Sequence, residues 1–174
     1  MNSRVEGCDS GVGWGGASKL QRDDRGAHVG DCFVRPLVLI IEDNASDARL
    51  LLDALSEAGL GVATLVAANG VDGYNMLVRR EPYRDLPLPA LIILDINLPA
   101  IDGRSMLKTL KSEARWRGIP VVVFSSSPAH RVECLAVGAV DYVVKPMVYD
   151  AYVAFARTLQ RHLGGQAADF AARR

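Results

Sequence analysis

The sequence lacks several features that would define a protein class. Its three cysteines, Cys8, Cys32 and Cys134, are odd in number and spaced like neither a zinc site nor a disulfide framework. Basic and acidic residues number 20 each, and the formal net charge of +0 argues against a strongly basic nucleic-acid-binding domain. There is no apolar run of roughly 18 residues, as a membrane span requires, and no secretory signal. We therefore expect a soluble protein of a reducing compartment, the cytoplasm.

The length and amino-acid composition of the chain are those of one globular domain. The chain has 174 residues, of which 49% are hydrophobic and 23% charged. Residues 1–35 contain many glycines and no apolar periodicity, so we expect a disordered leader there. Residues 36–164 carry regular apolar segments and form the predicted domain, and residues 165–174 form a short C-terminal tail.

Two kinds of segment alternate within the predicted domain. Five short apolar runs are continuous, as in strands covered on both faces: residues 37–41, 62–67, 91–94, 120–124 and 140–144. Amphipathic segments lie between and after them, with the weakest helix pattern at residues 71–80. This order predicts an α/β domain with a doubly wound, five-stranded parallel sheet and five helices.

Polar residues stand where the predicted strands end. They are Glu42 and Asp43 after the first strand, Asp95 after the third, Ser125 after the fourth and Lys145 after the fifth. Each alone has an ordinary structural explanation, as a helix cap, a turn residue or a solvated lysine. Because the carboxyl ends of parallel strands meet at one edge of the sheet, we expect all five to line one crevice.

The residue types in this crevice suit phosphoryl transfer. Three carboxylates repel one another unless a cation neutralises them, and such oxygen ligands with open water positions suit Mg²⁺. The hydroxyl of Ser125 and the ammonium of Lys145 could bind the remaining oxygens of a phosphoryl group. Asp95 is the expected nucleophile, since carboxylates form aspartyl phosphates.

These motifs give the domain a family resemblance. The runs in question are VLIIEDN at residues 38–44, LDINLPAIDG at 94–103, FSS at 124–126 and DYVVKP at 141–146. Together they resemble the receiver domain of two-component response regulators, over most of the predicted domain. The resemblance implies a flavodoxin-like sheet with strand order 2-1-3-4-5. The extension at residues 80–89 is similar to that of receivers found beside bacteriophytochromes.

The resemblance also implies roles for individual residues. Asp95 would accept the phosphoryl group, and Glu42, Asp43 and Asp95 would hold Mg²⁺ together with the backbone carbonyl of Asn97. Lys145 and Ser125 would bind the phosphoryl oxygens. Ser125 and Tyr142 would form the switch pair, with Tyr142 rotating inward after phosphorylation. The bond between Lys145 and Pro146 is expected to be cis, a form that costs only about 0.5–1 kcal/mol before proline.

The function expected from this resemblance is signalling. A histidine kinase, such as one of the phytochrome type, or a histidine phosphotransfer protein would donate the phosphoryl group. The domain would catalyse its own phosphorylation and dephosphorylation. After residue 163 too few residues follow for a DNA-binding output domain, so we expect a stand-alone receiver. The activated form is expected to bind a partner, or a second copy, through the fourth helix (around Arg131 and Glu133), the fifth strand and the fifth helix (around Tyr149 and Asp150).

A phosphatase or hydrolase with an aspartyl nucleophile is the alternative. A haloacid-dehalogenase-type enzyme would have a second aspartate two residues after its nucleophile. Asn97 stands at that position, which makes the enzyme the weaker hypothesis.

Overall fold

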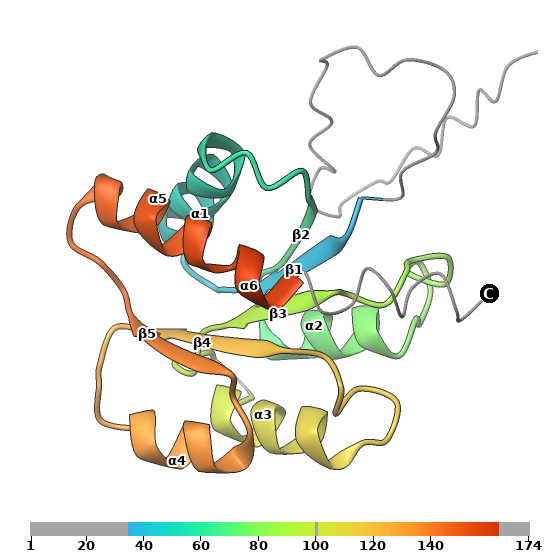
Figure 1. Cartoon of the computed structure of the whole chain (residues 1–174). Helices are drawn as coiled ribbons and strands as arrows, with labels where there is room; N and C mark the ends of the chain where they lie inside the picture. The colour runs from blue at the N-terminus through green and yellow to red at the C-terminus, as the bar shows by residue number, and fades with distance from the viewer. Residues whose placement is uncertain (1–34, 100, 164–174) are drawn as a thin grey trace, which may run out of the picture.

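The computed structural model describes residues 35–99 and 101–163 as a three-layered α/β domain (Figure 1). Its strands are β1 (Leu37–Ile41), β2 (Ala63–Ala67), β3 (Leu91–Leu94), β4 (Val121–Ser125) and β5 (Asp141–Val144). Its helices are α1 (Ala45–Glu57), α2 (Gly70–Leu77), α3 (Gly103–Ser112), α4 (Arg131–Val137), α5 (Tyr149–Thr158) and the single turn α6 (Gln160–Leu163). The predicted tail, and the predicted leader apart from Arg35, lie outside the described residues.

All strand pairs are parallel, and the order β2-β1-β3-β4-β5 confirms the predicted topology. The central strands β1, β3 and β4 are buried along their whole length, whereas the edge strands β2 and β5 are partly exposed. This difference explains why the central runs are so uniformly apolar. The chain leaves β1 for β2 on one side and later returns to β3 on the other, and this reversal opens a crevice at the carboxyl ends of β1 and β3.

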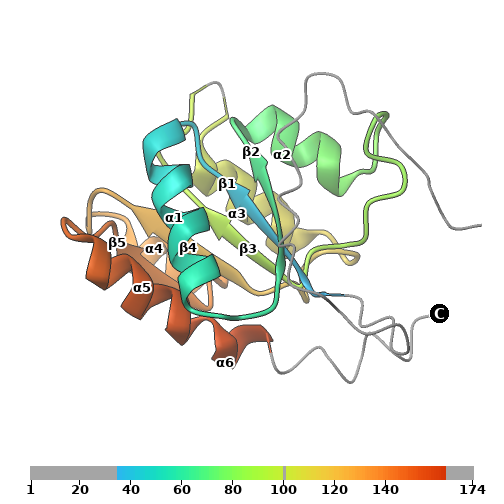
Figure 2. The ribbon, with the colours of Figure 1, turned by 90° about the horizontal axis from the view of Figure 1, so that it is seen from above.

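Alternate residues of each strand enter two separate core layers. Leu39 and Ile41 of β1 pack with side chains of α2, α3 and α4, whereas Val38 and Ile40 pack with side chains of α1 and α5. Figure 2 shows α1, α5 and α6 on one side of the sheet and α2 and α3 on the other. The period of two along a strand produces both layers from one apolar run.

Helix ends follow local capping chemistry. The Asn44 side chain accepts hydrogen bonds from the first turn of α1, and Asn69 does the same for α2, the helix with the weakest sequence signal. Gly138 ends α4 in the left-handed conformation with φ +116°. The predicted final helix is interrupted at Leu159, which separates α5 from α6.

Strand bounds differ from the predicted ones by one residue at β2, β4 and β5. Pro120 precedes β4 because proline has no N–H for the ladder, although its carbonyl still accepts from the amide of Ile92. No helix of residues 35–99 and 101–163 is both long enough and apolar enough to cross a membrane.

Candidate functional site

The predicted site residues meet at the carboxyl edge of the sheet. Glu42 and Asp95 directly follow β1 and β3, Ser125 is the last residue of β4, and Lys145 directly follows β5. The sheet ladder extends to these residues, since the amide of Asp95 donates to the carbonyl of Ile41 and that of Lys145 donates to the carbonyl of Ser125. Their backbone positions are therefore fixed by the sheet rather than by a loop.

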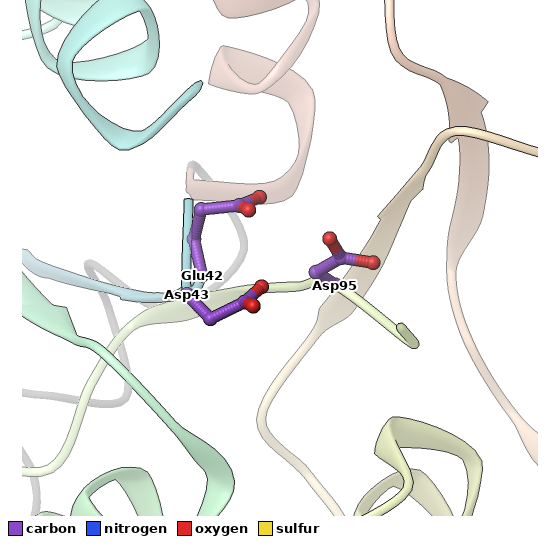
Figure 3. A group of neighbouring side chains, drawn as sticks. All are labelled: Glu42, Asp43 and Asp95. Carbon is purple, nitrogen blue, oxygen red and sulfur yellow. The ribbon is translucent and has the colours of Figure 1, made fainter. Parts of the chain in front are cut away.

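Three carboxyl groups form an acidic cluster at this edge, made by Glu42, Asp43 and Asp95 (Figure 3). One ligand oxygen of each lies within 4.8 Å of the others, and Glu42 and Asp43 point toward Asp95. Glu42 and Asp95 are only 2% and 4% exposed, while Asp43 faces solvent. This set of hard oxygen ligands, open to water on one side, fits a divalent cation.

Lys145 neutralises part of this negative charge. Its ammonium lies 2.7 Å from Glu42 Oε2, 2.7 Å from Asp95 Oδ2 and 2.8 Å from Asp47 Oδ2, and its side chain is 11% exposed. Burial acts to lower the pKa of Lys145, but the hydrogen bonds that its ammonium donates to Asp47, Asp95 and Glu42 outweigh burial and leave the pKa raised. The lysine is thus held in its charged form.

Glu42 has a strongly perturbed pKa. The pKa of its carboxyl group is raised from 4.5 to about 7, mainly by burial and in smaller part by the neighbouring Asp95 charge, against the opposing effect of the Lys145 ammonium. Its second oxygen accepts a hydrogen bond from the amide of Asn44 at 3.2 Å. A carboxyl group of this kind binds a cation best after it has lost its proton.

Asn97 joins the two loops that border Asp95. Its backbone amide donates to Asp95 Oδ1 at 2.8 Å and so orients the carboxylate. Its side-chain amide donates to Ser126 Oγ at 3.1 Å and to Ser125 Oγ at 3.4 Å. Ser125 is fully buried, and its hydroxyl oxygen also accepts from the amide of Ser127. The expected metal contact of the Asn97 carbonyl stays a prediction.

Tyr142 already lies inside the domain. Its ring is buried, its hydroxyl donates to the carbonyl of Ser127, and Arg131 donates to the carbonyl of Tyr142 at 2.5 Å. The ring is thus buried in the structure as it stands, as that of a fixed core aromatic without a switch role would also be. The rotation itself stays a prediction.

The prediction of a cis peptide bond before Pro146 is wrong for this structure. The cis peptide bond of the described residues is Glu81–Pro82, in the extension before β3, and Lys145–Pro146 is not cis. Because cis and trans differ by only about 0.5–1 kcal/mol before proline, the local sequence does not decide between them.

Sequence reasoning missed Asp47. It is the third residue of α1 and reaches the same ammonium as the two buried carboxylates. Its signal was its place four residues after Asp43, one helical turn from the crevice.

A parallel sheet with an acidic cluster and a lysine at its topological reversal defines a receiver module. Comparison with known proteins agrees: a family model of the response regulator receiver domain matches residues 38–156. The chain belongs to this family. Family membership thus favours the signalling function over the aspartyl hydrolase.

Individual relatives support the same placement. The chain is 36% identical over 126 residues to the probable transcriptional regulatory protein SilR of Salmonella typhimurium, a match that covers 71% of this chain and 50% of SilR. The chain thus spans about half the length of the transcriptional regulators it matches.

Solved structures match a larger share of their own length. The phosphorylated cyanobacterial phytochrome response regulator RcpA superposes with a TM-score of 0.69 at 26% identity, over 76% of this chain and 96% of RcpA. The Mn²⁺-bound response regulator Rcp1 superposes with a TM-score of 0.66 at 25% identity, over 72% of this chain and 91% of Rcp1. A divalent-metal site at the acidic cluster agrees with the second match.

Proposed function

We propose that the protein accepts a phosphoryl group onto Asp95 from a histidine kinase or a histidine phosphotransfer protein. The observation that carries this proposal is that an ammonium group, a backbone amide and two further carboxyl groups all surround the Asp95 carboxylate. The Lys145 ammonium lies 2.7 Å from one Asp95 oxygen, the Asn97 amide lies 2.8 Å from the other, and Glu42 and Asp43 complete the acidic cluster beside it.

Glu42, Asp43 and Asp95 are the proposed side-chain ligands of Mg²⁺, with the Asn97 carbonyl as a fourth ligand. Bound there, Mg²⁺ would neutralise charge on the phosphoryl oxygens. Manganese in the Rcp1 structure supports a divalent ion at such a cluster.

The chain's own residues position the reaction. One oxygen of Asp95 attacks phosphorus while the bond to the donor, a histidine nitrogen in a kinase, breaks and returns its electron pair to that nitrogen. Lys145 and Ser125 bind the phosphoryl oxygens, and the hydroxyl of Ser125 must turn from its present contacts to do so. Dephosphorylation is a separate step, in which a water oxygen attacks phosphorus, the bond to Asp95 breaks with its electron pair returning to the carboxylate, and the proton of the water leaves with the released phosphate or to solvent. Because the site needs only positioning and charge neutralisation, we propose that the domain catalyses both steps itself.

A phytochrome-type histidine kinase is the proposed donor. RcpA is a phytochrome response regulator and matches over three quarters of this chain, which supports that class of kinase. Such a donor would place the protein in the cytoplasm, where kinase and receiver meet.

Apolar side chains on α4, β5 and the start of α5 support an output surface there. Val132 on α4 is 83% exposed, and Val144 and Tyr149 are also exposed. Glu133, which we assigned to this surface, instead turns to α3 and pairs with Lys108 at 3.1 Å. We propose that phosphorylation promotes homodimerisation through the surface of α4, β5 and α5.

Intact mass spectrometry after incubation with acetyl phosphate tests the phosphoacceptor. The wild-type protein should gain one phosphoryl group in Mg²⁺ and none in EDTA, and Asp95→Asn should gain none under either condition. Equal labelling of wild type and Asp95→Asn would exclude Asp95 as the acceptor. Labelling in EDTA would exclude the role of the metal.

A further inference from the structure

Lys145 has a third carboxylate partner that belongs to neither strand end. Of its three ion pairs, Glu42 and Asp95 come from the acidic cluster, whereas Asp47 comes from α1 and is not one of the clustered residues. The Asp47 side chain is 23% exposed, compared with 2% and 4% for the other two. The ammonium is therefore shared between the cation-binding group and a separate helix.

Helix α1 holds Asp47 firmly in this place. Asn44 caps the helix, and its side-chain oxygen accepts from the amides of Ser46 at 2.9 Å and Asp47 at 3.4 Å. Leu51, one turn further on, is fully buried in the core layer shared with α5. A carboxylate in a first helical turn is also stabilised by the positive end of the helix dipole.

The two clustered partners of Lys145 have competing roles under the proposed function. A divalent cation would take up the charge of Glu42 and Asp95, and phosphorylation would convert an oxygen of Asp95 into an acyl phosphate. Either event weakens the electrostatic attraction between these two carboxylates and the Lys145 ammonium, because the cation or the phosphoryl group then takes part of their charge. Asp47 is outside the cluster and loses nothing in either event.

We propose that Asp47 is a positioning residue for Lys145, whose ammonium it keeps in the crevice while the cation and the phosphoryl group occupy Glu42 and Asp95. The inference rests on the proposed function of Asp95. Without Asp47, the ammonium is held by Glu42 and Asp95 alone, so it competes with the entering cation for both.

The direct test observes the ammonium itself. In protein labelled with ¹⁵N-lysine, the hydrogen-bonded Lys145 ammonium should give a slowly exchanging NMR signal with and without Mg²⁺. Asp47→Asn should lose that signal when Mg²⁺ is added. Asp53→Asn is the matched control, because Asp53 lies on the same helix and pairs with Arg49 on its exposed side. A signal that survives Mg²⁺ in Asp47→Asn would overturn the inference.

A double-mutant cycle on Mg²⁺ affinity, measured by calorimetry, separates this role from simple charge removal. Asp47→Asn should weaken binding about five-fold more in the wild type than in the Lys145→Met background, a ratio that corresponds to a coupling of about 1 kcal/mol. Equal weakening in both backgrounds would mean that Asp47 acts without Lys145, and the inference would be wrong.

Acetyl phosphate labelling of the same variants distinguishes the two proposals. If the wild type is not labelled, the proposed function fails. If the wild type is labelled and Asp47→Asn is labelled at the same rate in saturating Mg²⁺, only the role of Asp47 fails. We expect labelling of Asp47→Asn to be slower and that of Asp53→Asn to be unchanged.

Discussion

Burial of the Glu42 carboxyl group connects the stability of the domain with the metal binding proposed for it. Its side chain is almost fully inaccessible, yet it must carry a negative charge to bind a cation. Burial raises its pKa to about 7, so near neutral pH the metal-free domain holds a proton there in part of its molecules. The fold bears the free-energy cost of ionising Glu42 at the position to which the proposed function assigns a cation ligand.

This cost predicts a pH dependence of stability for the metal-free protein. Because the pKa of Glu42 is higher in the folded state than in the unfolded state, the folded state binds more protons between pH 4.5 and about 7. The contribution of Glu42 to stability is therefore fully present below pH 4.5 and is lost as the pH rises through about 7. Glu42→Gln should remove the decrease and raise the unfolding free energy at pH 8 by about 2 kcal/mol.

Urea unfolding in EDTA at pH 5 and pH 8 measures the effect. Lys145 keeps Asp47 and Asp95 as partners in Glu42→Gln, which limits the disturbance to one carboxyl group. Asp53→Asn, on the exposed side of α1, should keep the pH dependence of the wild type. A wild-type domain equally stable at both pH values would contradict the raised pKa.

At the level of residues, the sequence predicts which polar residues follow the strands, but it does not predict which distant groups a side chain contacts. Glu42, Asp43, Asp95, Ser125 and Lys145 follow apolar runs, and parallel topology is enough to bring them together. Asp47 was missed because a pattern along α1 does not say which strand end its first turn covers. The hydrogen bond from the Tyr142 hydroxyl to the Ser127 carbonyl joins β5 to the loop after β4, and no local pattern records such a contact.

Helix α3 begins in contact with the backbone that carries Asp95. Gly103 is its first residue, and a Cβ atom there would lie 2.4 Å from the Asp95 carbonyl oxygen and 2.5 Å from Ile96 Cα. Backbone atoms cannot yield as a flexible side chain can. Gly103 is therefore needed for the close approach of α3 to the end of β3.

Gly103→Ala should destabilise the domain by about 3 kcal/mol, because the added methyl group must push α3 from the Asp95 loop. It should also slow labelling by acetyl phosphate, since Asp95 moves with that loop. Chemical unfolding and intact mass spectrometry measure the two effects.

Gly118→Ala is the matched control, since a Cβ atom there meets no atom within 4 Å and its φ is not in the left-handed range. It should change the unfolding free energy by no more than about 0.5 kcal/mol. Similar losses in both variants would show that alanine is unfavourable for another reason than the contact at Gly103.

At the level of elements, apolar runs predicted all five strands, and the errors lie at their ends. Strand β4 starts after Pro120 because the ladder needs an N–H there, and β5 starts at Asp141. Helix α2 had a poor amphipathic pattern, yet the Asn69 cap and the connection between parallel strands both require it. The break at Leu159 had no signal in the apolar spacing, which continues through to Leu163.

At the level of the whole molecule, strand β5 connects the site around Asp95 to the proposed output surface. Lys145 directly follows this strand, Tyr142 lies within it, and Val144 is its exposed last residue. Arg131 of α4 donates to the Tyr142 carbonyl, so the helix and the strand are joined at this point. A shift of β5 or Tyr142 after phosphorylation would reach α4 through that bond.

Beryllofluoride, an analogue of the phosphoryl group, should therefore turn the monomer into a dimer in the presence of Mg²⁺. Val132→Glu on α4 should weaken this dimer at least about ten-fold, since it places a charge in an apolar interface. Sedimentation equilibrium measures the association. Val71→Glu, on an exposed position of α2, is the control and should dimerise like the wild type. NMR shifts confined to the Asp95 pocket, without association, would instead favour a passive phosphate shuttle.

Strand β5 lies at the end of the sheet, and this position bears on how the protein behaves at high concentration. In the described part of the chain its outer edge carries no ladder partner, and two exposed valines lie at its ends, Val140 just before the strand and Val144 as its last residue. Such an edge is a template on which another chain can add a strand and start an aggregate. The strand is only four residues long, and the ion pair between Asp141 and Arg161 at 2.5 Å places charge beside it. The shortness of the strand and the charge of this ion pair both oppose such addition, so we expect removal of Arg161 to make the domain more prone to aggregate at high concentration.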